Sequence, residues 1–157
     1  MNFTNEIYLT SKEIHLNDHN YRYKIKPLNI KLMGRQDNWT TYFLNSEEIA
    51  KKINRPSNYF GKFISYSLSC PMKYDKDKDC LTFKGDYSSE IITKYFIEFI
   101  KIYVLCPNCD LPETQLFLHK DKKLKNLSHN CNACGIISLV KTKSSDKTFE
   151  FIEKNTK

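Results

Sequence analysis

The sequence predicts an α+β fold, in which a small mixed α/β domain is followed by a C-terminal four-cysteine module. Between residues 21 and 103, short β-branched and aromatic runs alternate with segments whose apolar residues recur at helical spacing. Further on, two Cys-x-x-Cys pairs, Cys106/Cys109 and Cys131/Cys134, are separated by 21 residues. Each pair presents two sulfurs on a tight turn, and four thiolates satisfy a tetrahedral zinc ion. The module is therefore predicted to be a zinc ribbon.

The predicted ligands of one Zn²⁺ are Cys106, Cys109, Cys131 and Cys134. The gap between the pairs is one residue beyond the usual range of about 15–20. Two disulfides or unconnected thiols are the alternative interpretation. Four thiolates leave no coordination position for water, so the predicted ion is structural and not catalytic.

The expected organisation along the chain has four parts. Residues 1–20 form a flexible N-terminal arm or an extra edge element, residues 21–103 the α/β domain, residues 104–153 the zinc ribbon and residues 154–157 a tail. Ribbon strands are expected at Leu116–Leu118, Leu124–Asn130, Ile136–Lys141 and Thr148–Ile152.

The first half of the α/β domain begins with an extended segment and a hairpin. Residues 21–27 alternate rings and charges, and strands at 29–33 and 39–44 flank a turn-rich stretch at 34–38. Asn45 and Glu48 have the spacing of a capping box for a helix that ends near Ile53. Ser57 or Asn58 begins a second helix, whose apolar face carries Phe60, Phe63, Ile64 and Leu68.

The second half of the domain contains the strongest helical pattern. A charged turn is expected at Lys73–Asp79 and a strand at Cys80–Lys84. A helix then begins at Ser88 or Ser89. Its apolar stripe, which we interpret as core, consists of Ile91, Ile92, Tyr95, Phe96, Phe99, Ile100 and Tyr103.

Composition indicates a folded cytoplasmic monomer. The chain is 40% hydrophobic, and no apolar run approaches the ~20 residues that a membrane span needs. Its N-terminus lacks the basic start and apolar run of a signal peptide. Cysteines committed to zinc fit a reducing compartment, and Cys70 and Cys80 are expected to be buried or free thiols.

The formal net charge of +7 favours an acidic partner such as RNA. The basic excess is densest in the cysteine module, where Lys122, Lys123 and Lys125 are candidate RNA contacts. A solvated lysine surface is the alternative interpretation.

The sequence contains no catalytic constellation of its own. It has no G-x-x-x-x-G-K-[ST] phosphate loop, and its histidines show no ligand spacing. His129, near Cys131, is expected at the surface and not beside the metal. Arg22, between two tyrosines on an extended segment, can stack on a ring, pair with an acid, contact phosphate or enter another protein's nucleotide site as an arginine finger.

Several short sequence motifs, which follow one another along the chain in the order found in a known family, carry a resemblance to that family. They are Tyr21-Arg22-Tyr23-Lys24, Asn54-Arg55-Pro56, Tyr59-Phe60-Gly61, Leu105-Cys-Pro-Asn-Cys109, Pro112-Glu113-Thr114 and Asn130-Cys-Asn-Ala-Cys134-Gly135. From about Tyr21 to Ile152 the chain resembles the N-terminal domain of eukaryotic translation initiation factor 5. That domain shares its fold with the beta subunit of initiation factor 2.

The resemblance implies a translation initiation factor that acts in trans and is not an enzyme. It would promote GTP hydrolysis by the gamma subunit of initiation factor 2 on the small ribosomal subunit, with initiator tRNA and mRNA, during start-codon selection. The family's essential arginine falls on Arg22. Lys24 and Arg55, inside matching words, become candidate RNA or partner contacts.

Three departures from the family pattern keep alternatives open. Thr40 and Asn58 stand where family members usually carry lysines, and these 157 residues hold no counterpart of the family's C-terminal helical-repeat domain. Either the basic contacts have moved or stimulation is weaker. The alternatives are a binding module that occupies the same site without activation, a short homologue of the factor 2 beta subunit, and a generic nucleic-acid-binding ribbon.

Overall fold

The structure is a computed structural model that describes residues 6–16, 18–120, 125–140 and 147–155. The chain forms two compact units. Pro27–Glu98 make one, called here the central unit, and Met1–Lys26 with Phe99–Lys157 make the other, the terminal unit. The boundary falls within helix α3 (Ser89–Tyr103). The mixed α/β class is confirmed, whereas the division at residues 20 and 103 stays a prediction.

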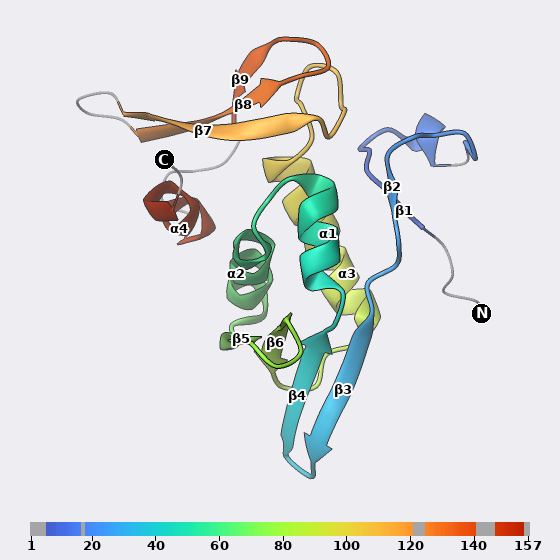
Figure 1. The fold of residues 1–157 in the computed structure, drawn as a ribbon, viewed down its shortest axis with the longest axis vertical. Helices are drawn as coiled ribbons and strands as arrows, with labels where there is room; N and C mark the ends of the chain where they lie inside the picture. Colours follow the sequence, from blue (N-terminus) through green and yellow to red (C-terminus); the bar gives the residue numbers. More distant parts are fainter. Residues whose placement is uncertain (1–5, 17, 121–124, 141–146, 156–157) are drawn as a thin grey trace. The chain divides into compact units, whose positions relative to one another are not determined.

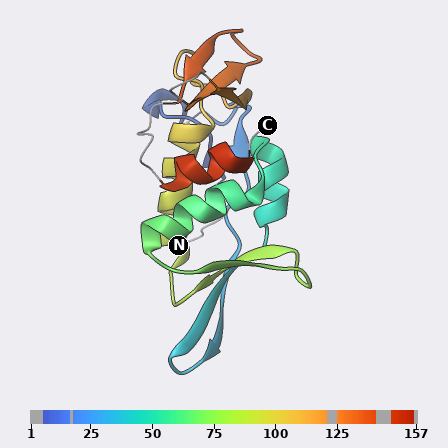
Figure 2. The ribbon, with the colours of Figure 1, turned by 90° about the vertical axis from the view of Figure 1, so that its left-hand side faces the viewer.

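The central unit is built on an antiparallel four-stranded sheet in the order β3-β4-β6-β5. Its strands are β3 (Ile30–Arg35), β4 (Asn38–Phe43), β5 (Met72–Asp75) and β6 (Cys80–Lys84). Helices α1 (Ser46–Ile53) and α2 (Ser57–Leu68) lie on one face of this sheet, as Figures 1 and 2 show.

A cluster of three phenylalanines forms the core of this unit. Phe43 from β4, Phe60 from α2 and Phe96 from α3 are fully buried. Their ring centroids lie 5.7 Å (Phe43–Phe60), 5.3 Å (Phe60–Phe96) and 6.3 Å (Phe43–Phe96) apart. Tilted and edge-on rings at these distances add attraction to the area that they bury. The predicted stripe of α3 is confirmed as core for Ile92, Phe96, Phe99, Ile100 and Tyr103, whereas Ile91 is exposed and Tyr95 is half-buried.

Phe96→Ala is expected to destabilise the protein by about 3–5 kcal/mol, because it empties a ring-sized space between two other rings. Denaturant unfolding followed by far-UV circular dichroism measures this loss. Ile91→Ala, on the exposed side of the same helix, is the matched control and should cost less than ~1 kcal/mol. Equal losses in both variants would contradict this packing.

Two local predictions for the central unit are wrong in detail. Helix α1 begins after Asn45 as expected, but the Asn45 side chain makes no cap hydrogen bond. It instead accepts a hydrogen bond from the Asn29 N–H (2.9 Å) and donates one to the Pro27 carbonyl (3.0 Å). These bonds fix the residues that immediately precede β3. The predicted charged turn at Lys73–Asp79 is shorter, since β5 extends through Asp75 and pairs with β6.

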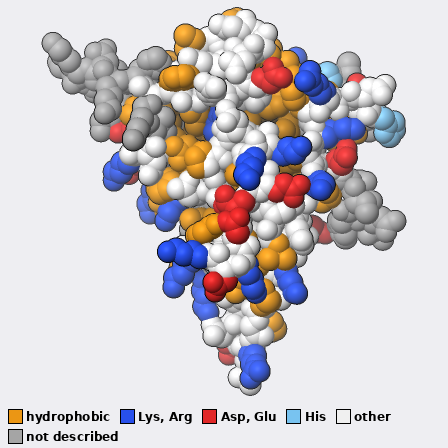
Figure 3. Space-filling view, viewed as in Figure 1, with side chains coloured by type: hydrophobic (Ala, Val, Ile, Leu, Met, Phe, Trp, Pro, Cys, Tyr) orange, Lys and Arg blue, Asp and Glu red, His pale blue; other side chains and the backbone are white. Residues whose placement is uncertain are grey.

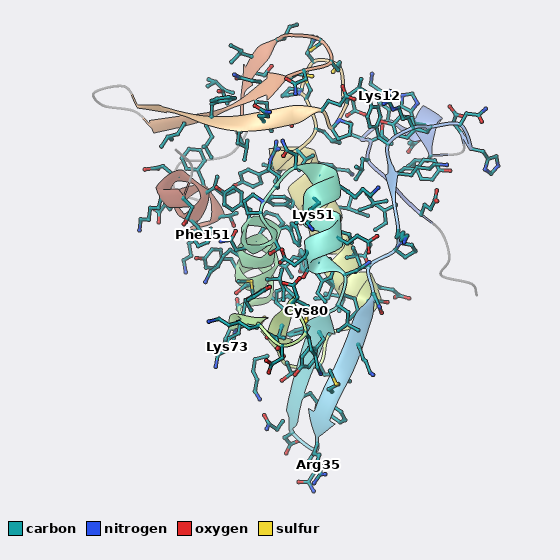
Figure 4. All side chains as sticks on the ribbon, in the orientation of Figure 1. Lys12, Arg35, Lys51, Lys73, Cys80 and Phe151 are labelled. Atoms are coloured by element: carbon teal, nitrogen blue, oxygen red, sulfur yellow. The ribbon has the colours of Figure 1, made fainter. Side chains whose placement is uncertain are left out.

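The β3–β4 hairpin turns where the sequence predicts it. Gly34 has a φ of +143°, and a Cβ there would lie 2.2 Å from the Asn38 carbonyl oxygen, so the turn requires glycine. Figure 4 shows Arg35 at the tip of this hairpin, with its side chain directed away from the sheet.

Cys70 and Cys80 are buried free thiols, as expected, and burial raises the pKa of both.

The terminal unit contains two further sheets. A short ladder joins β1 (Ile7–Tyr8) to β2 (Lys24–Ile25), so the first residues contribute an edge element. Antiparallel strands β7 (Thr114–Lys120), β8 (Lys125–Cys131) and β9 (Ile137–Leu139) form the other, with β8 in the middle (Figure 1).

The predicted closing strand at Thr148–Ile152 is wrong, because helix α4 (Lys147–Asn155) occupies this segment. Phe149 and Phe151 alternate as in a strand, but the buried residues are Thr148, Phe149 and Ile152. That spacing belongs to one face of a helix. None of the helices within the described ranges is long and apolar enough to cross a bilayer.

Candidate metal centre and arginine segment

The four predicted ligand residues come together in the terminal unit. Cys106 follows the end of α3, and Cys131 is the last residue of β8. Cys109 and Cys134 lie in the turns that these two residues open. All four Sγ atoms lie within 4.8 Å of one another, so the group can hold a metal ion.

The sulfur separations exclude the disulfide interpretation for this structure. Sγ of Cys106 lies 3.8 Å from Sγ of Cys134, and Sγ of Cys109 lies 3.5 Å from Sγ of Cys131. A disulfide needs about 2.05 Å. Each of these two sulfur pairs joins a cysteine of the first turn to a cysteine of the second. One metal centre shared by both turns therefore fits better than two disulfides.

The two turns have the same backbone design. In the first, the Cys106 N–H donates to the Leu111 carbonyl (3.0 Å), and the Asp110 N–H donates to the Cys106 carbonyl (2.9 Å). In the second, the Cys131 N–H donates to Ile136 (3.2 Å), and the Gly135 N–H donates to Cys131 (2.9 Å). Asp110 and Gly135 both have positive φ, 62° and 75°. The two Cys-x-x-Cys motifs therefore fold into two turns of the same type, each of which carries two cysteine sulfurs.

Three of the four thiols have shifted pKa values. Burial raises the pKa of the Cys109 thiol to about 12, and burial also raises the pKa of Cys131. The Ile136 N–H that faces Cys134 lowers the pKa of that thiol to about 7. Buried thiolates are unfavourable without a positive charge beside them, and a metal ion supplies that charge.

Asp110 has a role that the sequence analysis missed. Its buried carboxylate accepts hydrogen bonds from the Thr10 hydroxyl (2.6 Å), the Ser11 N–H (3.0 Å) and the Ser11 hydroxyl. These bonds join the N-terminal segment to the residue that follows Cys109. The sequence signal is an aspartate directly after a Cys-x-x-Cys motif, and this signal does not identify Thr10 and Ser11 as its partners.

Arg22 lies on the extended segment that pairs with the N-terminal residues held by Asp110. It is exposed, and its guanidinium carbon lies 5.9 Å from the centroid of the Tyr23 ring. Within the described residues the guanidinium has no hydrogen bond or ion pair. Tyr21 on one side is buried, and its hydroxyl donates to the Leu9 carbonyl (2.9 Å). Tyr23 on the other side donates its hydroxyl to Glu113 Oε1 (2.7 Å), and this bond raises the pKa of Tyr23.

The other basic candidates differ in their surroundings. Lys24 forms an ion pair with Glu6 (3.3 Å) and donates to the His19 carbonyl (2.9 Å). Arg55 is only 4% exposed and donates to the Asn54 carbonyl, and burial lowers the pKa of its guanidinium to about 10. Lys122 and Lys123 lie outside the described residues, as does the side chain of Lys125. All five stay predicted contacts.

His129 is buried, so the expected surface position is wrong. Its exposure is 0%, and its Nε2 lies 3.1 Å from the carbonyl oxygen of Ile102. It pairs with Ser138 on one side and Leu116 on the other, since β8 is the middle strand. His129 lies on the face of β8 that is covered by the end of α3, whose Ile102 carbonyl it contacts, and this long-range contact is not visible in the sequence.

A basic groove of about 740 Å³ lies on the central unit. Tyr42, Thr82 and Lys84 line it from strands β4 and β6, together with Lys73 and Asp75 of β5 and Lys76. The Lys78 ammonium stands 4.5 Å from the centroid of the Tyr42 ring. On the face drawn in Figure 3, basic side chains are interspersed with acidic and uncharged ones. Three lysines against one aspartate give the lining a net positive charge, which favours an anionic ligand.

Residues 13–137 match the family model for a domain found in initiation factors 2B and 5. The chain belongs to this family. Several relatives named eukaryotic translation initiation factor 5 are similar to it. The mouse (Mus musculus) protein is 32% identical over 140 residues, which are 89% of this chain and 32% of that protein. The yeast (Saccharomyces cerevisiae) protein is 33% identical over 115 residues, which are 73% of this chain and 28% of that protein.

A plant relative is similar to the chain to the same extent. "Probable eukaryotic translation initiation factor 5-2" of Arabidopsis thaliana is 34% identical over 139 residues, 88% of this chain and 31% of that protein. The chain thus spans about a third of the length of the relatives that it matches. The family match contains Arg22 and all four clustered cysteines, whereas α4 lies beyond it.

Proposed function

We propose that this member of the initiation factor 2B and 5 domain family is a translation initiation factor of the factor 5 type. It acts in trans and promotes GTP hydrolysis by the gamma subunit of initiation factor 2 on the small ribosomal subunit during start-codon selection. One observation carries the proposal. Arg22 is exposed on a segment that is anchored on both sides, and its guanidinium has no hydrogen bond or ion pair within the described residues.

The chemistry of this role needs one group from the chain. A transferring phosphoryl group develops charge on its equatorial oxygens, and a guanidinium placed there offsets that charge. The partner's own site holds the nucleotide and its Mg²⁺. The chain then supplies only the arginine and the surfaces that dock it, for which the basic groove of the central unit is a candidate toward ribosomal RNA or initiator tRNA.

The metal in this proposal is one structural Zn²⁺ bound by Cys106, Cys109, Cys131 and Cys134. A tetrahedron with zinc–sulfur distances of about 2.3 Å has sulfur–sulfur edges of about 3.8 Å. Two of the observed separations, 3.5 and 3.8 Å, are close to this edge length, and all four sulfurs lie within 4.8 Å of one another. An all-thiolate donor set also favours zinc over hard cations such as Mg²⁺.

The test adds a fluorescently labelled chain to a reconstituted complex of small subunit, initiator tRNA, mRNA and GTP-bound initiation factor 2. We expect saturable binding together with faster GTP hydrolysis. Binding without acceleration would replace the proposal with the non-activating binding module, which Thr40 and Asn58 favour. A stable 1:1 complex with the gamma subunit alone in gel filtration would indicate a beta-subunit homologue. RNA binding that does not depend on factor 2 would leave only the generic nucleic-acid binder.

A further inference from the structure

We infer that Glu113 is a positioning residue for Arg22 and acts through Tyr23. The inference rests on the proposed function, because it takes Arg22 as the group that reaches the partner's nucleotide. Its direct observation is the hydrogen bond in which the Tyr23 hydroxyl donates to Glu113 Oε1 at 2.7 Å. Both residues are half-buried, so this charge-assisted bond is partly protected from solvent.

Glu113 is itself held by the second cysteine turn. Its carbonyl accepts the N–H of Asn132, which follows Cys131, at 2.8 Å. The next residue, Thr114, begins β7, is paired with Cys131 and donates its hydroxyl to the Val104 carbonyl at the end of α3. The carboxylate of Glu113 therefore projects from backbone that is fixed to the second cysteine turn and to the end of α3.

The segment that carries Arg22 has a second anchor, but that one reaches the cysteine turns only indirectly. Tyr21 is bonded to Leu9, and its ring stacks on His15 with the centroids 4.6 Å apart. Leu9 belongs to the N-terminal stretch, which Asp110 holds through Thr10 and Ser11. Glu113 is thus the residue that connects the immediate neighbour of Arg22 to the cysteine module.

This connection matters because an arginine acts on a transition state only when it is held in place. A misplacement of about 1 Å costs up to ~100-fold in rate, and a flexible side chain on a free segment spends little time in the productive geometry. Loss of the Tyr23–Glu113 bond frees the ring against which the guanidinium lies at 5.9 Å. The maximal stimulated rate should then fall while docking of the chain is retained.

The test uses the full, metal-loaded chain in single-turnover GTP hydrolysis at increasing chain concentration. We expect Glu113→Ala and Tyr23→Phe each to lower the maximal rate by about 10- to 100-fold, with an unchanged half-saturating concentration. Glu113→Gln should restore most of the rate, because its amide oxygen still accepts the Tyr23 hydroxyl. The double variant Tyr23→Phe/Glu113→Ala should be no slower than either single variant, since both remove the same bond. Glu98→Ala removes an exposed carboxylate from α3 and is the matched control.

A second measurement separates this inference from the proposed function. Amide hydrogen exchange in the isolated chain should quicken at least ~10-fold in Glu113→Ala at Leu9 and Lys24, whose N–H groups bond to Tyr23 and Arg22. It should stay unchanged in Glu113→Gln. If Arg22→Ala abolishes stimulation but Glu113→Ala does not reduce it, the inference is overturned and the proposed function stands. Unchanged exchange in Glu113→Ala also overturns it, and an unaltered chain that does not stimulate overturns both.

Discussion

Arg22→Ala is expected to lower the stimulated rate of GTP hydrolysis by initiation factor 2 by about 10³–10⁵-fold, the range that arginine fingers supply. The fold should be unaffected, because Arg22 is exposed and its side chain has no hydrogen bond or ion pair within the described ranges. The measurement is single-turnover hydrolysis in the reconstituted complex, with binding of the variant followed in the same samples.

Two variants make this result specific to the guanidinium. Arg22→Lys keeps the charge but loses the planar fork of donors, so it should recover only part of the rate. Lys51→Ala removes an exposed positive charge from α1, at the position that Figure 4 labels, and should leave the rate within about twofold. A loss below about tenfold in Arg22→Ala would contradict the finger role.

Metal removal is expected to unfold the cysteine module, because a structural zinc site contributes on the order of 10 kcal/mol to the folded state. Cys106→Ser should have the same effect, since Cys106 is buried and supplies one of the four sulfurs of the cluster. The amide resonances of β7, β8 and β9, followed by NMR during titration with a chelator, measure the loss.

Cys70→Ser is the matched control for the metal experiment. Cys70 is also a buried free thiol, but it lies in the central unit and outside the cluster. This variant should keep one equivalent of zinc and a native-like ribbon spectrum. Native chemical shifts in the metal-free protein would contradict the structural role of the ion.

Local and strongly periodic features could be predicted from the sequence. The stripe of α3 extends over four turns, so it indicated a buried helix without further information. The two Cys-x-x-Cys words specify their turns within six residues each, and their hydrogen bonds are local. These parts depend on neighbours in the sequence, which is why periodicity and spacing were sufficient.

The features that the sequence did not reveal depend on distant partners. Asp110 bonds to Thr10, which is 100 residues away, and Tyr23 bonds to Glu113, which is 90 residues away. Helix α4 was expected as a strand because Phe149 and Phe151 alternate, whereas the residues that become buried, Thr148, Phe149 and Ile152, follow the helical period. The Asn45 side chain could cap helix α1 or bond to the residues that precede β3. Only the tertiary structure shows that it bonds to Pro27 and Asn29.

The most direct test of the central claim is the single-turnover rate of GTP hydrolysis as a function of the concentration of the unaltered chain. The reaction contains small subunit, initiator tRNA, mRNA with a start codon, and initiation factor 2 loaded with GTP. We predict that the rate constant rises hyperbolically to a plateau at least about 10³-fold above the rate without the chain. A plateau at the unstimulated rate, with the chain bound in the same samples, would contradict activation in trans and leave a protein that only occupies the site.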